Sequence, residues 1–293
     1  MKRMLGAGLL ALTMAAQVYG QGLPATDVWL VGIEDGLAGK PVRISDGDGY
    51  NNQPHFSPDD AVIYYTREMP GEGGSQTDVA AYQLKTSTTA MLTDTAESEY
   101  SPTPVPNRNA VSVIQADLEQ KQYLWAIDVN TGHMDLLFPD IEPVGYHAWF
   151  SDDEVAMFIL GDSFTLQTAR LNHAGTRVAA DNIGRSIRTH PQSAEVLFVD
   201  KNHQPWEIAA LDPITGATRR VMPLFPGSED FTIDSAGAFW TGNGSKLYKR
   251  SPNDARWELV ADFTASGISS ISRLAVNRGN DKIALVSERA GQD

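Results

Sequence analysis

Histidines are the side chains of this sequence best suited to hold a metal ion or to move a proton. They are His55, His133, His147, His173, His190 and His203. None of them is spaced as in a short zinc motif such as His-x-x-x-His. A ring fold can bring His55 and His147 together, as it can carboxylates such as Glu99 and Asp230, but sequence spacing does not test this. The sequence by itself therefore predicts no metal site.

Other motifs that carry chemistry are also missing. The chain has no Gly-x-Ser-x-Gly sequence, the motif that presents a nucleophilic serine in many hydrolases. The glycines of Glu68–Gly74 join two apolar runs, and no helix follows to bind a phosphate. The acidic turn Asp46–Tyr50 is short and lacks the distal glutamate of a calcium loop. We therefore predict no catalytic residue and no cofactor, with a weakly bound divalent cation left open.

A pattern that repeats about every 40–48 residues supplies the framework for the polar side chains. Its clearest copy is Gln53–Asp60, followed by the apolar run Ala61–Tyr65. Further copies start near Ser101, His147, Ile187, Phe231 and Ser272. Strand-like runs separated by turns at this period are typical of propeller blades. The fold class that we predict is all-β, a six-bladed β-propeller of four-stranded antiparallel blades.

The first blade is expected to have strands near residues 53–57, 61–67, 79–84 and 89–93. In the second blade, the turn Asn130–Gly132 joins a strand at 123–129 to a return strand at 133–138. The last repeat contains only its two inner strands, whereas Thr26–Val31 and Pro41–Ser45 resemble the outer strands of a blade. We predict that these N-terminal strands complete the last blade and close the ring, which hides both sheet edges.

Propellers act through the face on which the innermost strands begin and the central channel opens. Loops there contain Tyr50, Arg185, Glu229, Asp230, Ser269 and Ser270, among others. The residues that we select as a channel-mouth binding site are Asn51, Asn52, His55, Glu99, Tyr100, Tyr146, His147, Arg188 and Arg273. The competing interpretation is a polar channel filled with water and internal ion pairs.

The N-terminus is typical of a secretory signal. Met1–Arg3 is basic, and the following residues 4–16 carry no charge. We predict a signal peptide at 1–20 and one propeller domain at 21–293; a retained anchor helix is the alternative. The chain has no cysteine, so an exported form relies on burial, not on disulfides. Export without disulfides favours a bacterial periplasmic or secreted protein.

The formal net charge of −14 argues against nucleic acid and anionic lipid as partners. It suits cationic partners or bound cations, although an acidic surface that keeps the protein in solution is the simpler explanation. We expect no membrane insertion after signal cleavage. A monomer is expected, because a closed ring needs no second chain.

Several blade motifs resemble those of a known family. The residues that match the family's blade motif are Pro54, Phe56, Ser57, Pro58 and Asp59 in the first blade, Trp149, Ser151 and Asp152 in the third, and Ser287–Arg289 in the last. The turns Asp128–Gly132 and Asp212–Gly216 also match it. They resemble the TolB-like (WD-repeat-like) bacterial β-propellers over about residues 26–293. The resemblance implies the propeller alone, without the α/β domain that precedes it in TolB. It also implies an envelope protein as partner.

Two classes of function remain open, and a third possibility, a receptor-side domain of an uptake system, differs from the first class only in its partner. The first is a periplasmic module that binds a protein or another ligand without catalysis. The second is a metal-assisted lyase or hydrolase that acts on a small or saccharide substrate in the channel. The second function requires His55, His147 and carboxylates to surround one ion at about 2–2.6 Å, the ligand distances of zinc and calcium.

Overall fold

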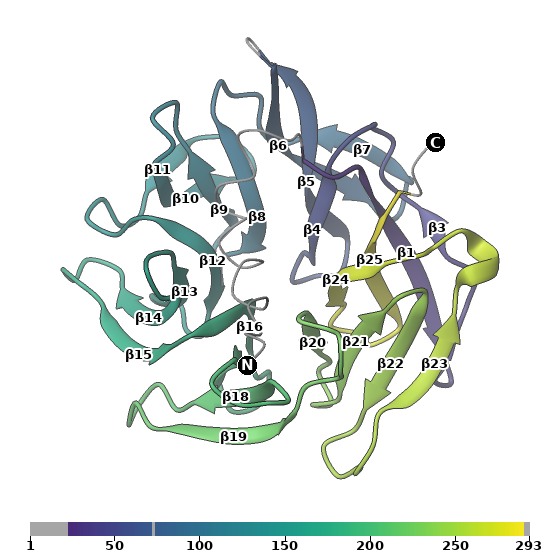
Figure 1. Cartoon of the computed structure of the whole chain (residues 1–293). Coiled ribbons are helices and arrows are strands. Elements are labelled where there is room, and N and C mark those ends of the chain that lie inside the picture. The colour runs from purple at the N-terminus through teal and green to yellow at the C-terminus, as the bar shows by residue number, and fades with distance from the viewer. Residues whose placement is uncertain (1–22, 72–73, 290–293) are drawn as a thin grey trace, which may run out of the picture.

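The computed structural model describes residues 23–71 and 74–289, which form a ring of six blades around a central axis (Figure 1). The predicted signal peptide lies outside the described residues. Blade 1 consists of β4 (Asn51–Phe56), β5 (Val62–Gly71), β6 (Gly74–Gln83) and β7 (Thr88–Met91). Blade 2 consists of β8 (Ser98–Pro104), β9 (Ala110–Ala116), β10 (Gln122–Asp128) and β11 (Met134–Leu136). Blade 3 consists of β12 (Val144–Trp149), β13 (Glu154–Ile159), β14 (Thr165–Arg170) and β15 (Arg177–Asp181).

Blades 4 and 5 repeat the same antiparallel order from the axis outward. They are β16 (Ile183–Thr189), β17 (Val196–Asp200), β18 (Glu207–Leu211) and β19 (Thr218–Pro223), then β20 (Phe231–Ile233), β21 (Phe239–Asn243), β22 (Lys246–Arg250) and β23 (Glu258–Asp262). A short 3₁₀ helix, Thr264–Ser266, leads from β23 toward the last blade. The prediction of a six-bladed propeller with four-stranded blades is confirmed.

Blade 6 joins the two ends of the described chain. Its inner strands are β24 (Ile271–Val276) and β25 (Lys282–Glu288), and β1 (Thr26–Glu34) pairs with β25 from Thr26↔Glu288 to Gly32↔Lys282. The short strands β2 (Leu37–Ala38) and β3 (Val42–Arg43) both pair with β1. In Figure 1 the purple β1 lies beside the yellow β25. The predicted closure is confirmed, although the outermost strand is shorter than the expected 41–45.

Polar contacts reinforce this closure. Arg289, just after β25, donates from Nε and Nη2 to the two carboxylate oxygens of Asp27 at 3.1 and 2.6 Å. The hydroxyl of Ser45 also donates to Asp27, at 3.0 Å. These charge-assisted bonds hold β1 in the register in which its apolar side chains face the interior.

The core is divided among the interfaces between neighbouring blades. Each of the six interfaces contains its own cluster of buried apolar side chains. Along β25, Ile283 and Leu285 pack toward blade 5, while Ala284 and Val286 pack toward blade 1. This alternation follows from the two-residue period of a strand, and it explains why the middle strands are apolar on both faces. Trp149 packs in the cluster between blades 2 and 3.

Five of the innermost strands contain a shift in register, namely β4, β8, β12, β16 and β24. In β4 and β8 the shifts coincide with left-handed backbone at Gln53 (φ 56°) and Ser101 (φ 55°). The Gln53 side-chain oxygen accepts hydrogen bonds from Ser101 N and Thr66 Oγ1, both at 2.9 Å. Such bulges redirect the neighbouring side chains, here at the wall of the ring axis.

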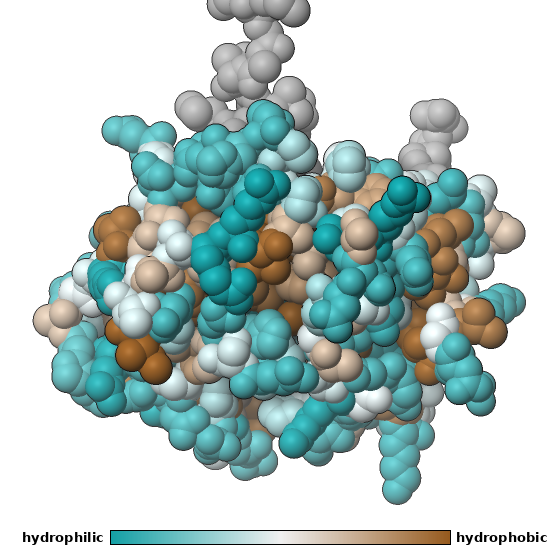
Figure 2. Space-filling model, turned by 90° about the horizontal axis from the view of Figure 1, so that it is seen from below, coloured by the Kyte–Doolittle hydropathy of each residue, from teal (hydrophilic) through white to brown (hydrophobic). Residues whose placement is uncertain are grey.

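The outer surface of the ring is mainly hydrophilic, with apolar residues in small separate groups on the side shown in Figure 2. The most exposed large apolar side chain among the described residues is that of Ile214, at 91% exposure in the hairpin after β18. Among the described residues, no helix has the length and apolar character needed to cross a membrane.

Candidate functional site

A small cavity lies on the axis of the ring, where residues of all six blades meet. Its volume is about 30 Å³, and we call it the axial cavity. It is lined by Gln53, Pro54, His55, Ser101, Thr103, Tyr146, His147, Arg185, Ser186, Ile187, Arg188, Asp230 and Arg273. Five of the predicted site residues are therefore brought together, namely His55, Tyr146, His147, Arg188 and Arg273.

Asp230, directly before β20, is the carboxylate of this cavity and is only 5% exposed. Arg185 donates to both of its oxygens, at 3.1 Å from Nε and 2.6 Å from Nη2. Arg273 donates to the same carboxylate at 2.9 Å and to the Tyr146 hydroxyl at 2.9 Å. Burial alone raises the pKa of Asp230, but Arg273 and Arg185 outweigh burial and hold that pKa well below its usual range. The carboxylate is therefore charged, and its oxygens are occupied.

Arg188 is the third guanidinium of the cavity and differs from the other two. It donates to the carbonyl oxygens of Ile187 and Leu274, at 2.8 and 3.2 Å. No carboxylate among the described residues lies within ion-pair distance of it. Burial lowers the pKa of Arg188 to about 10, with Asp230 opposing and Arg273 adding to the shift. It is still charged at neutral pH.

The two histidines of the cavity are neutral at physiological pH. Burial lowers the pKa of His55 to about 3, with the charge of Arg188 adding to the shift. Burial also lowers the pKa of His147 to about 3. His147 Nε2 lies 2.7 Å from Ser112 Oγ, which also accepts a hydrogen bond from Trp149 Nε1 at 2.9 Å. Ser112 thus fixes the ring of His147 against the core between blades 2 and 3.

A larger depression, which we call the mouth groove, opens on the face where the innermost strands begin. Its volume is about 660 Å³, and it runs over blades 4, 5 and 6. It is lined by Arg185, Gln204, Pro205, Trp206, Leu224, Phe225, Pro226, Gly227, Ser228, Glu229, Asp230, Gly242, Asn243, Gly244, Ser270, Ile271, Ser272 and Glu288. Arg185 and Asp230 line both spaces, so the groove adjoins the axial cavity.

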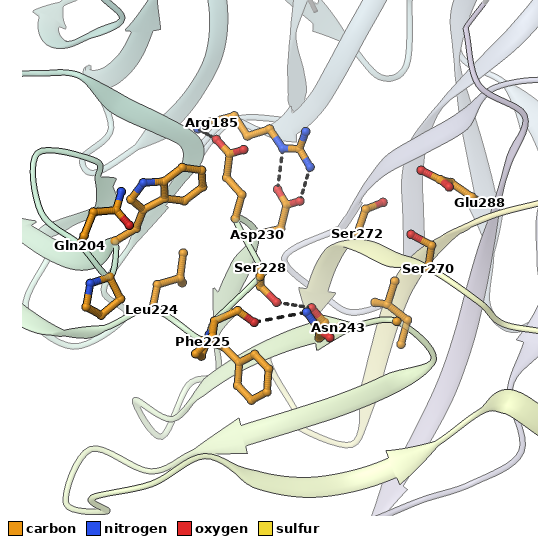
Figure 3. A pocket seen from close by; sticks show the side chains of 18 residues that line it. Arg185, Gln204, Leu224, Phe225, Ser228, Asp230, Asn243, Ser270, Ser272 and Glu288 are labelled. Carbon is orange, nitrogen blue, oxygen red and sulfur yellow. Dashed lines mark hydrogen bonds and ion pairs between the residues drawn. The ribbon is translucent and has the colours of Figure 1, made fainter. Parts of the chain in front are cut away.

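The groove combines a fixed apolar side with polar edges. Phe225 stacks on Tyr248 with ring centroids 4.2 Å apart and meets Trp257 edge-on at 6.0 Å. The Lys201 ammonium lies 4.4 Å from the ring centroid of Trp206. In Figure 3, Gln204 and Glu288 lie on opposite sides of the groove, while Arg185 faces Asp230. Aromatic side chains held in this way are the usual anchors of protein and peptide binding.

Four of the predicted site residues do not line either space. Asn51 and Asn52 are buried against β1, where Asn51 donates to Thr26 O at 3.1 Å and Asn52 donates to Thr26 Oγ1 at 3.4 Å. Tyr100 packs against the cluster between blades 2 and 3. Glu99 is completely buried and accepts hydrogen bonds from Thr93, Thr95 and Gln115. In this structure their contacts serve to join blades.

Glu99 gives the first testable prediction. Burial raises its pKa to about 7, and the nearby Asp78 carboxylate adds to the rise. Between the ordinary pKa of 4.5 and the folded pKa, the folded chain retains a proton that the unfolded chain releases, so the stability that Glu99 contributes falls as pH rises. The E99Q variant, which is always neutral, should gain roughly 2–3 kcal/mol relative to wild type between pH 5 and pH 8.

Urea unfolding at these two pH values measures the effect. The matched control is E258Q, because Glu258 is exposed at the start of β23. Its difference from wild type should be the same at both pH values. A pH-independent difference for E99Q as well would contradict the raised pKa of Glu99.

The acidic turn Asp46–Tyr50 contacts arginines. Asp46 pairs with Arg67 at 2.8 Å, and Asp48 pairs with Arg289 at 2.7 Å. Across residues 23–71 and 74–289, no three His, Asp or Glu side chains are grouped so as to hold a metal ion. The weak cation site at this turn stays a prediction that nothing here tests.

Sequence reasoning did not select the groove residues Trp206, Phe225 and Asn243. They lie in the hairpin between β17 and β18, the loop before β20, and the end of β21. Arg185 and Asp230 were recognised as loop residues of the correct face but were not selected for the site. The position of these loops in the repeat could have indicated them. In each blade, the loop between the second and third strands lies on the same face as the loop before the innermost strand.

Comparison with known proteins supports the same architecture. No family model matches the chain. A candidate TolB of Agrobacterium tumefaciens superposes with a TM-score of 0.71 at 10% identity, over 92% of this chain and 100% of that chain. TolB of Acinetobacter baumannii gives a TM-score of 0.59 at 12% identity, over 90% of this chain and 64% of that chain. The chain has a TolB-like propeller fold.

Other similar proteins differ in what they do. An uncharacterised protein of Agrobacterium fabrum is 26% identical over 110 residues, which are 38% of this chain and only 35% of that protein. A gluconolactonase of Xanthomonas campestris has a TM-score of 0.65 at 10% identity, over 90% of this chain and 96% of that one. An oligogalacturonate lyase of Vibrio parahaemolyticus has a TM-score of 0.59 at 13% identity, over 84% and 80%. At these identities the structural likeness concerns the fold, which hosts both binding proteins and enzymes.

Proposed function

We propose that this TolB-like propeller is an exported binding module that holds a segment of an envelope protein in the mouth groove. The observation that carries the proposal is the groove itself, a space of about 660 Å³ whose lining includes Trp206 and Phe225, with Phe225 held by Tyr248 and Trp206 by Lys201. A space of this size accepts several side chains of a peptide segment. The basic, then uncharged N-terminal sequence supports export to a bacterial periplasm.

The polar groups around the groove also suit an extended partner. Ser270 and Ser272 lie on blade 6, and Asn243 lies at the end of β21. Ser228 is already satisfied, because its hydroxyl donates to Gly242 O at 2.6 Å. Neutral hydroxyl and amide groups at the edge of an apolar anchor site fix the orientation of a partner without a large desolvation cost.

A channel-sited lyase or hydrolase is the second candidate, favoured by the convergence of His55 and His147 on the axial cavity. Two features weigh against it. The carboxylate of Asp230 is bound by Arg185 and Arg273, and the positive charge of Arg188 acts on His55 and repels a cation there. The binding module is therefore the function that the geometry supports better.

Affinity capture of the tagged protein from crosslinked envelope extract of its source cells tests the proposal. The F225A variant should recover at least about tenfold less of one envelope partner, since aromatic anchors typically contribute 2 kcal/mol or more. The matched control is I214A, which removes an exposed apolar side chain from the outer hairpin of blade 4. It should leave capture unchanged.

A second variant tests the same site should F225A fail to fold. Asn243 makes only a 3.4 Å hydrogen bond to Pro226 O, so N243W should fill the groove while leaving the fold intact. Equal capture by wild type, F225A and N243W would contradict the proposed site.

A further inference from the structure

The charges of the axial cavity do not balance. Among the described residues, Arg185, Arg188 and Arg273 line it together with one carboxylate, Asp230, which pairs with Arg185 and Arg273. The next carboxylate, Glu229, pairs with Lys201 at 2.8 Å. The cavity therefore carries an excess of positive charge inside a chain whose formal net charge is −14. A buried charge without a counter-charge is costly, so this cavity attracts an anion.

Hydrogen-bonding groups in the same cavity are also unsatisfied. Ser101 and His147 are each only 5% exposed, and Ser101 Oγ and His147 Nδ1 have no partner among the described residues. Ser112 Oγ donates its proton to Thr103 O at 3.0 Å. When this hydroxyl turns to donate to His147 Nε2 instead, His147 Nδ1 carries a proton of its own and can donate to a bound carboxylate. Buried polar atoms are nearly always paired in native proteins, so these two indicate an additional bound group or water.

Size and shape narrow the class of anion. The cavity volume of about 30 Å³ is a few times the roughly 10–15 Å³ that a single water needs, enough for a carboxylate group but not for a sugar ring. The planar guanidinium of Arg188 matches the geometry of a carboxylate. Because the cavity shares Arg185 and Asp230 with the mouth groove, a carboxylate can enter from that side.

We propose that the axial cavity binds a carboxylate group between Arg188, Ser101 and His147. Its source is either a free small molecule or an acidic side chain or C-terminus of the partner segment in the groove. The second source rests on the proposed function, whereas the first does not.

Titration of the signal-free protein with formate, at constant ionic strength in chloride, tests the proposal. The readout is the imidazole NMR signal of His147 in protein labelled with ¹⁵N-histidine. Formate should shift this signal to saturation in wild type, and its affinity should fall at least about tenfold in R188Q, because a charge-assisted hydrogen bond is lost. The control R256Q, at an exposed arginine, should bind formate as wild type does.

The S101A variant provides an independent test should R188Q fail to fold. It removes only the unpaired hydroxyl and should weaken formate binding roughly tenfold, because a hydroxyl that donates to a carboxylate makes a charge-assisted hydrogen bond. A shift that never saturates, or an affinity equal in wild type, R188Q and S101A, would overturn the carboxylate site.

Competition distinguishes the two sources. Formate that releases the captured envelope partner would place the carboxylate on that partner. Formate that binds but leaves capture unchanged would assign the cavity to a free carboxylate. Neither result depends on the F225A experiment, so failure of the groove proposal and failure of the carboxylate site can be separated.

Discussion

A chain that lacks Asp27–Ser45 is expected to lose its folded state and to aggregate. The deletion removes nearly all of β1 and the whole of β2 and β3, and it exposes the unpaired edge of β25. It also removes Val28, Val31 and Ile44 from the clusters on both sides of blade 6. The loss of this burial is expected to exceed the roughly 5–15 kcal/mol by which a typical domain is stable. Size-exclusion chromatography and circular dichroism measure the outcome.

Single substitutions refine this test of ring closure. V28D places a charge at a fully buried position between blades 6 and 1, without a partner for its carboxylate. It should abolish cooperative unfolding or lower the stability by about 4 kcal/mol or more. V42D is the matched control, because Val42 in β3 is 58% exposed, and it should change stability little. A soluble deletion product with cooperative unfolding would disprove the closure.

Replacement of Asp230 by alanine is expected to have the second largest effect. Arg185 and Arg273 would lose their shared carboxylate, and three partly buried arginines would line one cavity without it. Removal of one partner from a buried ion pair typically costs about 3–5 kcal/mol, because the other charge stays behind unpaired. Urea unfolding of wild type and D230A measures the loss.

Two comparisons show whether charge is the cause. D153A breaks the more exposed pair with Arg170 and should change the stability much less than D230A, because water screens an exposed ion pair. The double variant D230A/R188Q removes one unpaired charge and should recover part of the stability that D230A loses. A D230A variant as stable as wild type would contradict the electrostatic account of the channel.

Most of the fold follows from patterns that are local in the sequence. Turns such as Asp128–Gly132 and the apolar runs of the middle strands indicate the strands of each blade, because apolar runs bounded by turn residues are typical of buried strands. Closure by the N-terminus was also predictable, since the last repeat has two strands and the N-terminal segment supplies the others. Boundaries were less accurate: β5 and β6 extend to ten residues each, because the hairpin between them continues beyond the blade.

The site was predictable only in part, for a physical reason. Register shifts in β4, β16 and β24 decide that His55, Arg188 and Arg273 line the axial cavity, and bulges have no clear sequence signal. Asn51 and Glu99 occupy equivalent-looking positions at the starts of inner strands, yet they are buried in contacts between blades. The groove arises from hairpins of three blades, so no single stretch of sequence indicates it.

The central claim, that a partner segment lies in the mouth groove, is tested most directly by site-specific photocrosslinking in the source cells. A photoreactive residue at position 243 in the groove is compared with one at position 214 on the outer hairpin of blade 4. We predict a crosslink to one envelope protein from position 243 and none to that protein from position 214. A crosslink from position 214 alone, or none from position 243, would contradict the claim.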